Sequence, residues 1–267
     1  MRIFKRKLYE KLLDWKNNRS GRTAVLIEGA RRVGKSTLAR QFAQNEYESY
    51  VMIDFSIVKK DILELFDSIA DLDYFFLQLQ FRLGVSLKER KSLIIFDEVQ
   101  MCPKARQAIK HLVADGRYDY IETGSLISIR KNVKDIVIPS EEEKMILHPL
   151  DYEEFKWALG DATTIAQMRM IFEKRLSMGD AVTRKLMRDF RLYMAVGGMP
   201  QAVCEYLETN NLMDVDRVKR GIIQLYEDDF YRIDQSGRIS MLFDAIPAQL
   251  SSNASRFQVA SALGDNV

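Results

Sequence analysis

The chain has 267 residues, of which 47% are hydrophobic, and its 40 basic and 38 acidic side chains leave a formal net charge of only +2. This length predicts one large domain or two smaller ones, with enough apolar residues for a true core. Because the charges nearly cancel, bulk charge does not indicate nucleic-acid binding, although it leaves room for a local basic patch. The sequence has no secretory leader and no apolar run of about 18 residues, so we expect no membrane insertion.

Cysteine and histidine are both rare in this sequence. The chain has two of each, at Cys102, Cys204, His111 and His148. These numbers do not indicate a disulfide framework and leave no Cys/His cluster for zinc. They fit a reduced protein, so we expect a cytoplasmic location.

Hydrophobic periodicity predicts strands that alternate with helices over the first half of the chain. The predicted elements are a helix at 5–17, a strand at 23–28, a helix to about 45, a strand at 50–55, helices at 61–70 and 73–83, a strand at 92–98, a helix that opens at Pro103 and stops at Gly116, and strands at 118–122 and 144–147. Residues 73–83 also alternate as a strand would. A helix is preferred because a crossover must link parallel strands there.

This alternation predicts an α/β fold, with a parallel five-stranded sheet between layers of helices. A polar segment at about 129–143 precedes the last strand, and after Pro149 the pattern changes to helices alone. These helices are predicted around 165–176, 182–193, from Pro200 onward and over 214–232. An α/β core is therefore expected to precede a mainly helical region.

A glycine-rich segment between the first strand and its helix organises the rest of the chain. Its residues are Gly29, Ala30, Arg31, Arg32, Val33, Gly34, Lys35 and Ser36, followed by Thr37. The segment matches Gly-x4-Gly-Lys-Ser/Thr, and a strand before it with a helix after it is the context of a phosphate-binding P-loop. We expect its backbone N–H groups to bind phosphate, Lys35 to reach the β- and γ-phosphates, and Ser36 to ligate Mg²⁺. The alternative is a glycine-rich turn that binds nothing.

An acidic pair follows the buried strand at residues 93–96. Asp97 comes first after the strand and is expected at the carboxyl edge of the sheet, where open α/β sheets bind ligands. We expect Asp97 to hold Mg²⁺ opposite Ser36, and Glu98 to orient and polarise the attacking water. A surface Asp-Glu pair at a strand end is the alternative interpretation.

The next strand closes with Thr123-Gly124-Ser125, which would bring hydroxyl groups to the same edge. A polar side chain there is positioned to touch the γ-phosphate or the water. Of the two hydroxyls we prefer Ser125 as a catalytic contributor. The competing interpretation is a strand-to-helix turn with serine as a cap.

The sequence alone does not assign functions to the arginines near the predicted site. Arg31 and Arg32 lie inside the P-loop, either near the phosphates or on the outer, solvated face of the loop. An arginine that stabilises transition-state charge is not assigned, since Arg130, Arg175 and Arg191 are equal candidates. Residues 132–135, Asn-Val-Lys-Asp, have the wrong order for a guanine-reading motif, which favours adenine as the base.

Several segments together carry a family resemblance: GARRVGKST, LIIFDEVQ, ETGSL, LHPLDYEEF and GGMPQAV. In this combination the chain resembles prokaryotic AAA-like P-loop ATPases of the AAA-14 type, which are followed by a DUF4143 region and are related to STAND ATPases. The resemblance covers nearly the whole chain. It implies an ASCE core, in which one strand is inserted between the P-loop strand and the acidic strand.

The same resemblance implies a domain plan. Residues 1–150 would form the ATPase core with its N-terminal helix, residues 151–210 a helical lid, and residues 211–267 the start of a winged-helix-like region. The chain looks truncated within that last region, and the nuclease-like domain common in such proteins is not expected, because its acidic-lysine motif is missing.

The resemblance also implies two further contacts with the nucleotide. Gly198-Met199-Pro200 matches a Gly-x-Pro turn that meets the nucleotide in related ATPases, so Pro200 becomes a binding candidate; a plain turn between helices is the alternative. Arg6 and Tyr9 would flank the base.

Together these observations predict a Mg²⁺-dependent ATPase that cleaves the β–γ bond and uses nucleotide state to switch the packing of its helical region. One alternative is an interaction module that binds ATP or ADP with little turnover. Another is a DNA-associated motor or loader, and a small-molecule kinase is the least favoured. The macromolecular partner, protein or DNA, is not indicated.

Overall fold

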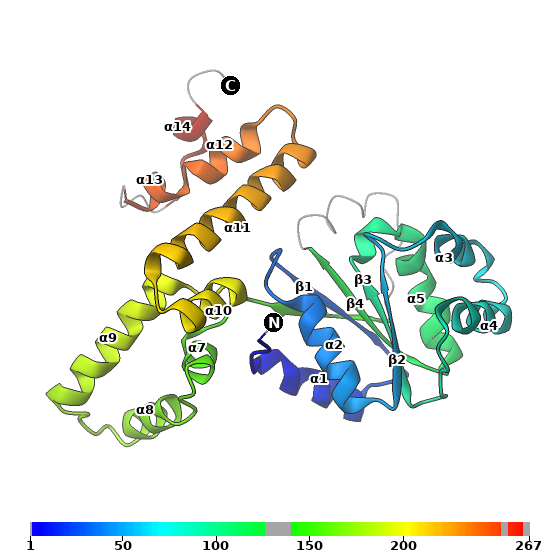
Figure 1. The fold of residues 1–267 in the computed structure, drawn as a ribbon, viewed down its shortest axis with the longest axis horizontal. Helices are drawn as coiled ribbons and strands as arrows, with labels where there is room; N and C mark the ends of the chain where they lie inside the picture. Colours follow the sequence, from blue (N-terminus) through cyan, green and yellow to red (C-terminus); the bar gives the residue numbers. More distant parts are fainter. Residues whose placement is uncertain (1, 126–139, 252–255, 264–267) are drawn as a thin grey trace. The chain divides into compact units, whose positions relative to one another are not determined.

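A single parallel sheet of five strands forms the centre of the first part of the chain (Figure 1). The computed structural model describes residues 2–125, 140–251 and 256–263. The strands are β1 (Ala24–Gly29), β2 (Ser49–Asp54), β3 (Ser92–Asp97), β4 (Asp119–Ser125) and β5 (Glu142–Leu147), in the spatial order β2-β3-β4-β1-β5. The predicted five-stranded parallel sheet is confirmed, and β4 is the strand inserted between the P-loop strand and the acidic strand.

Helices cover both faces of this sheet, because residues along each buried strand point alternately to opposite sides. Helices α1 (Lys7–Asn18) and α2 (Lys35–Glu46) pack on the face that includes Val25 and Ile27. On the face that includes Leu26, the covering elements are α3 (Lys60–Leu65), the short 3-10 helix η1 (Phe66–Ser68), α4 (Leu72–Leu83) and α5 (Pro103–Asp115). The two layers bury large side chains such as Trp15 and Phe96 completely.

The ambiguous stretch at 73–83 is helical, as the crossover argument predicts. Helix α4 begins at a cap in which the Asp71 side chain accepts the backbone N–H of Tyr74 at 3.0 Å. It ends at Gly84, whose φ of 65° is readily adopted by glycine. The alternating pattern arises because Leu77 and Phe81 are apolar yet 64% and 83% exposed, so they lie off the buried face.

After the sheet the chain is helical, as predicted. The first compact unit, Met1–Leu212, continues through α7 (Tyr152–Ala158), α8 (Thr164–Glu173), α9 (Asp180–Val196) and α10 (Pro200–Thr209). The second unit, Met213–Val267, holds most of α11 (Leu212–Ile233) together with α12 (Arg238–Asp244), α13 (Ile246–Ser251) and α14 (Val259–Leu263). In the second unit, Phe230 packs on Phe243 with ring centroids 5.0 Å apart. The division into lid and winged-helix-like region stays a prediction.

Four charged side chains that the sequence analysis did not single out are buried between α5 and the sheet: Glu28, Glu122 and Glu142 from the strands, and Arg106 from α5. Arg106 forms a two-point ion pair with Glu142, at 2.9 and 3.0 Å. Glu122 is fully buried, and neither of its carboxylate oxygens meets a hydrogen-bond donor among the described residues. Burial raises the pKa of Glu122 well above its ordinary value, and the neighbouring Glu142 raises it further while Arg106 opposes the shift. Burial therefore favours the protonated form of Glu122.

We predict that Glu122→Gln stabilises the protein increasingly as pH rises. The folded-state pKa of Glu122 is raised, so the native protein holds a proton that the unfolded chain releases above about pH 4.5. Wild-type stability should therefore fall by about 1.4 kcal/mol per pH unit between the unfolded and folded pKa values, and the amide avoids this loss. Calorimetric melting temperatures at pH 5 and pH 8 measure the difference. Glu89→Gln, at an exposed position, is the control, and an equal shift at both pH values would contradict the prediction.

Candidate functional site

The loop between β1 and α2 requires glycine at both glycine positions of the P-loop pattern. A Cβ on Gly29 would lie 2.3 Å from the carbonyl oxygen of Leu147, which is too close for any other residue. Gly34 has a φ of 97° and forms the N-cap of α2. Arg32 has a φ of 66°, a left-handed conformation that is uncommon outside glycine. The sequence therefore folds into a tight loop that ends at the positive end of a helix, as a phosphate site requires.

Lys35, the first residue of α2, turns its ammonium group back toward this loop. Its Nζ donates to the carbonyl oxygens of Gly29 at 3.1 Å and Ala30 at 3.0 Å, and the residue is only 5% exposed. Burial lowers the pKa of Lys35, whereas the carboxylates of Glu98 and Asp97 raise it. The loop thus holds a positive charge close to two acidic groups.

Two oxygen-bearing side chains that we expect to hold Mg²⁺ meet beside the loop, although they lie 61 positions apart in the sequence. The Ser36 hydroxyl donates to Oδ1 of Asp97 at 2.7 Å, and Asp97 is 5% exposed at the end of β3. Hydroxyl and carboxylate oxygens are the ligands that Mg²⁺ prefers, so these residues fit the cation that we expect them to hold. The described residues contain no group of three His, Cys, Asp or Glu side chains that could bind a metal alone. Substrate phosphate and water would complete the coordination.

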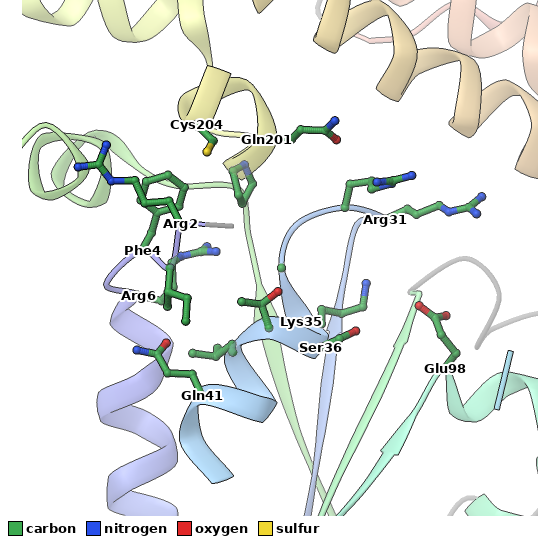
Figure 2. Close-up of a pocket in the computed structure, with 16 residues that line it drawn as sticks. Arg2, Phe4, Arg6, Arg31, Lys35, Ser36, Gln41, Glu98, Gln201 and Cys204 are labelled. Atoms are coloured by element: carbon green, nitrogen blue, oxygen red, sulfur yellow. The ribbon is translucent and has the colours of Figure 1, made fainter. Parts of the chain in front are cut away.

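Glu98 follows Asp97 in a strained conformation, with φ 55° and ψ 47°. Its backbone N–H donates to the Thr123 hydroxyl at 3.3 Å, and its carboxylate accepts a hydrogen bond from the side-chain amide of Gln100. Gln100 lies in the short 3-10 helix η2 (Val99–Met101) and is 9% exposed. These two contacts fix both the backbone and the carboxylate of Glu98, which points toward the P-loop in Figure 2.

Thr123 and Gln100 form hydrogen bonds with the acidic pair, and the sequence analysis did not predict a role for either residue. The Thr123 hydroxyl also donates to Oδ1 of Asp97, so this threonine links both acidic residues. Thr123 was noted only as the neighbour of the preferred Ser125, because the choice between them depends on strand register. Gln100 had one available signal, a polar residue within the apolar stretch after the acidic pair.

A cavity of about 560 Å³ opens above the P-loop, a size suitable for a nucleotide. Its walls come from residues 2–6 before α1, here called the N-terminal arm, and from the P-loop, the first turns of α2, Glu98 and the start of α10 (Figure 2). Lys35, Ser36 and Thr37 line the part of the cavity next to the P-loop, whereas Ile3 and Phe4 supply an apolar wall. The structure therefore places most of the predicted binding residues around one cavity.

Arg6 joins the N-terminal arm to this cavity. Its guanidinium donates to the carbonyl oxygen of Val33 at 3.1 Å, to Oε2 of Glu154 at 3.2 Å, and to the carbonyl oxygen of His148. The arginine and the glutamate side chains are each only 6% exposed. Because Val33 belongs to the P-loop and Glu154 to α7, one buried cation connects the loop to the first helix after the sheet.

The turn at Gly198-Met199-Pro200 lies against the P-loop, and the contact of Pro200 with a nucleotide that the resemblance implies stays a prediction. The backbone N–H of Leu150 donates to the Gly198 carbonyl at 2.7 Å, and a Cβ on Gly198 would lie 2.1 Å from the Leu150 oxygen. This close contact fixes Pro200 at the start of α10. Its Cγ would lie 3.8 Å from a Cβ built on Gly34, so Pro200 is next to the phosphate loop.

Some sequence candidates lie elsewhere. Ser125 is the half-buried last residue of β4 and, like Tyr9, is absent from the described cavity lining. The catalytic role of Ser125 stays a prediction. Arg175 follows α8 and Arg191 lies on α9; neither lines the cavity. Arg130 and the segment 132–135 fall outside the described residues.

The strand order, the P-loop after β1 and the acidic pair at the end of β3 define a P-loop NTPase of the AAA-like type. Residues 21–156, half of the chain, match the AAA domain family AAA_14, and the chain belongs to this family. Residues 187–267 match a domain of unknown function, DUF8612, where the resemblance predicted a DUF4143 region. No curated protein matches the chain.

Solved structures with a similar fold include the Walker-type ATPase PABY2304 of Pyrococcus abyssi, at 18% identity and a TM-score of 0.53, with 90% of this chain and 79% of that chain covered. The Aeropyrum pernix ORC1 protein in complex with DNA has 11% identity and a TM-score of 0.43, covering 98% and 81%. The STAND protein PH0952 of Pyrococcus horikoshii has 16% identity and a TM-score of 0.45, covering 91% and 37%. The first similarity supports the fold. None of the described helices has the length and apolar character needed to span a membrane.

We predict that Arg6→Ala lowers the free energy of unfolding by about 3–5 kcal/mol, because it leaves the Glu154 carboxylate buried without its cation. Urea unfolding at neutral pH measures the change. Lys11→Ala, at an exposed position of the same N-terminal region, should have an effect below about 0.5 kcal/mol. A similarly small loss for Arg6→Ala would show that the buried pair does not stabilise the fold.

Proposed function

We propose that this protein binds ATP with Mg²⁺ and hydrolyses the β–γ phosphoanhydride bond. The observation that carries the proposal is the position of Glu98. Its carboxylate faces the same cavity as Lys35 and Ser36, and Ser36 is hydrogen-bonded to Asp97, so the proposed phosphate-binding, metal-binding and water-activating groups lie close together. A nucleotide-binding module without turnover would need the first two groups and not the third.

Each residue has a distinct task in the proposed reaction. The P-loop backbone from Gly29 to Thr37 and the Lys35 ammonium bind the phosphates, while Ser36 and Asp97 hold Mg²⁺, which neutralises phosphate charge when bound. Glu98 orients a water molecule and accepts its proton. The water oxygen bonds to the γ-phosphorus as the bond to the β–γ bridging oxygen breaks, and ADP keeps that electron pair. Ser125 is retained as a candidate contact for the γ-phosphate or the water.

We predict that Glu98→Gln lowers ATP turnover by about 100-fold or more while ATP affinity changes little, because the amide keeps the shape and loses the base. Turnover is measured by phosphate release and affinity by calorimetric titration. Lys35→Ala should lose nucleotide affinity itself. Equal, slow hydrolysis by wild type and Glu98→Gln, with ATP still bound by both, would favour the interaction module that holds nucleotide with little turnover.

The proposal includes a switch that links nucleotide state to the helical region. Arg6 contacts the P-loop carbonyl of Val33 and α7 through Glu154, and Pro200 lies next to Gly34 at the start of α10. A shift of the loop on nucleotide binding would therefore act directly on two helices of the proposed lid, residues 151–210. Hydrogen exchange over α7 and α10 that is identical with ATP and ADP would contradict the switch.

A local basic surface favours nucleic acid as a second candidate function. Residues 164–196, from α8 to the end of α9, hold seven basic and three acidic residues, a net charge of +4 against +2 for the whole chain. Three of the arginines, Arg184, Arg188 and Arg191, are exposed at helical spacing along one side of α9. None of the three has an ion pair in the described part of the chain. This stripe is an electrostatic match for a phosphate backbone.

We predict that replacing these three arginines by glutamine abolishes any binding of the protein to a fluorescent DNA or RNA duplex at low salt. Wild-type affinity should fall steeply as salt rises, since phosphate contacts release counterions. Fluorescence anisotropy measures both effects. ATP turnover without nucleic acid should stay unchanged. If the wild-type protein shows no salt-sensitive binding, these arginines only form a solvated helix face, and the hypothesis of a nucleic-acid-binding function is wrong.

A further inference from the structure

Two arginines inside the P-loop are not explained by phosphate binding, because Lys35 already supplies a cation there. Both line the cavity, yet their settings differ. Arg32 is exposed and holds the left-handed backbone with φ 66°, whereas Arg31 is half-buried. The two neighbouring side chains therefore leave the same loop in different environments.

Arg31 lies on the side of the cavity that Glu98 borders (Figure 2). In Figure 2 its side chain extends from the top of the loop toward the side of the cavity on which Glu98 lies. Arg31 also lines the same cavity as Lys35 and Glu98.

Other arginines of the described chain are less suited to this place. Besides Arg31 and Arg32, the cavity is lined by Arg2 and Arg6. Figure 2 shows Arg2 and Arg6 on the side of the cavity away from Glu98. Arg31, by contrast, lies on the same side of the cavity as the proposed water-activating group, Glu98 (Figure 2).

We propose that Arg31 is a catalytic residue that contacts the γ-phosphate of ATP and stabilises the charge that develops there during hydrolysis, so that the protein carries its own arginine for this step. The inference rests on the proposed function. Lysine offers a single point charge, whereas the planar guanidinium can contact two oxygens at once. The phosphate must lie between Lys35, the Ser36–Asp97 pair and Glu98, and Arg31 borders that same space.

The test compares Arg31→Gln with Arg32→Gln, which remove the same charge from adjacent positions of one loop. Affinities for ADP and for a non-hydrolysable ATP analogue are measured by calorimetry with Mg²⁺, and turnover by phosphate release. For Arg31→Gln we expect analogue affinity to fall about 10-fold more than ADP affinity, and turnover to fall about 10³-fold. Arg31→Lys should recover part of the analogue affinity, which also shows that the altered loop still folds.

Arg32→Gln should change ADP and analogue affinity by the same factor, and Arg40→Gln, an exposed position on α2 outside the cavity, should change neither. An equal loss of both affinities in Arg31→Gln, or turnover within about 3-fold of wild type, would overturn the assignment. If wild type itself hydrolyses no ATP, the proposed function fails. The affinity ratio between analogue and ADP still decides whether Arg31 contacts the γ-phosphate.

Discussion

The hydrogen bond from Ser36 to Asp97 is the constraint on which the site depends. It joins the first turn of α2 to the end of β3, although β4 lies between the strands that lead to them. The bond forms only if β1, β3 and β4 end at matching heights, because a shift by one residue would turn each side chain to the opposite face. Thr123 reinforces this match, since its hydroxyl reaches the same Asp97 oxygen from the intervening strand.

A second requirement is that the loop be connected to the rest of the first unit. Burying the Arg6 guanidinium removes it from water, and this is favourable only because three acceptors surround it. Two of these acceptors are backbone carbonyls, which stay in place only while the loop and the end of β5 keep their conformation. The N-terminal arm, the P-loop and α7 therefore stabilise one another, and a displacement of any one of them weakens the contacts of the other two.

The sequence was sufficient for features that depend on local chemistry. Gly34, Lys35 and Ser36 follow from a loop pattern, and the sheet follows from apolar runs separated by helices. By contrast, Thr123 and Ser125 both alternate to the same side of β4, and only the pairing of Phe96 with Glu122 shows that Thr123 is level with Asp97. Register between distant strands is a tertiary property that one sequence does not specify.

The buried carboxyl of Glu122 was missed for a related reason. Within its strand it has the polar character expected of a solvent-facing position, and its burial depends on α5 covering that face of the sheet. A pattern-based prediction places such a residue outside the core. Its neighbours Arg106 and Glu142 come from other elements, so the reason that a carboxyl is tolerated there appears only when the three are seen together.

Two residues that line the cavity, Arg32 and Glu98, have strained backbone conformations, so the charged groups of the site are placed there at a cost in stability. Arg32 and Glu98 are held at φ 66° and φ 55°, where a residue other than glycine, asparagine or aspartate is disfavoured by about 1–2 kcal/mol. Glycine would relieve this strain at either position, but it would remove a charged side chain from the cavity. The surrounding contacts compensate at Glu98, where Thr123 holds the backbone N–H and Gln100 holds the carboxylate. A conformation that lowers stability is thus maintained where a charge is needed beside the phosphate loop.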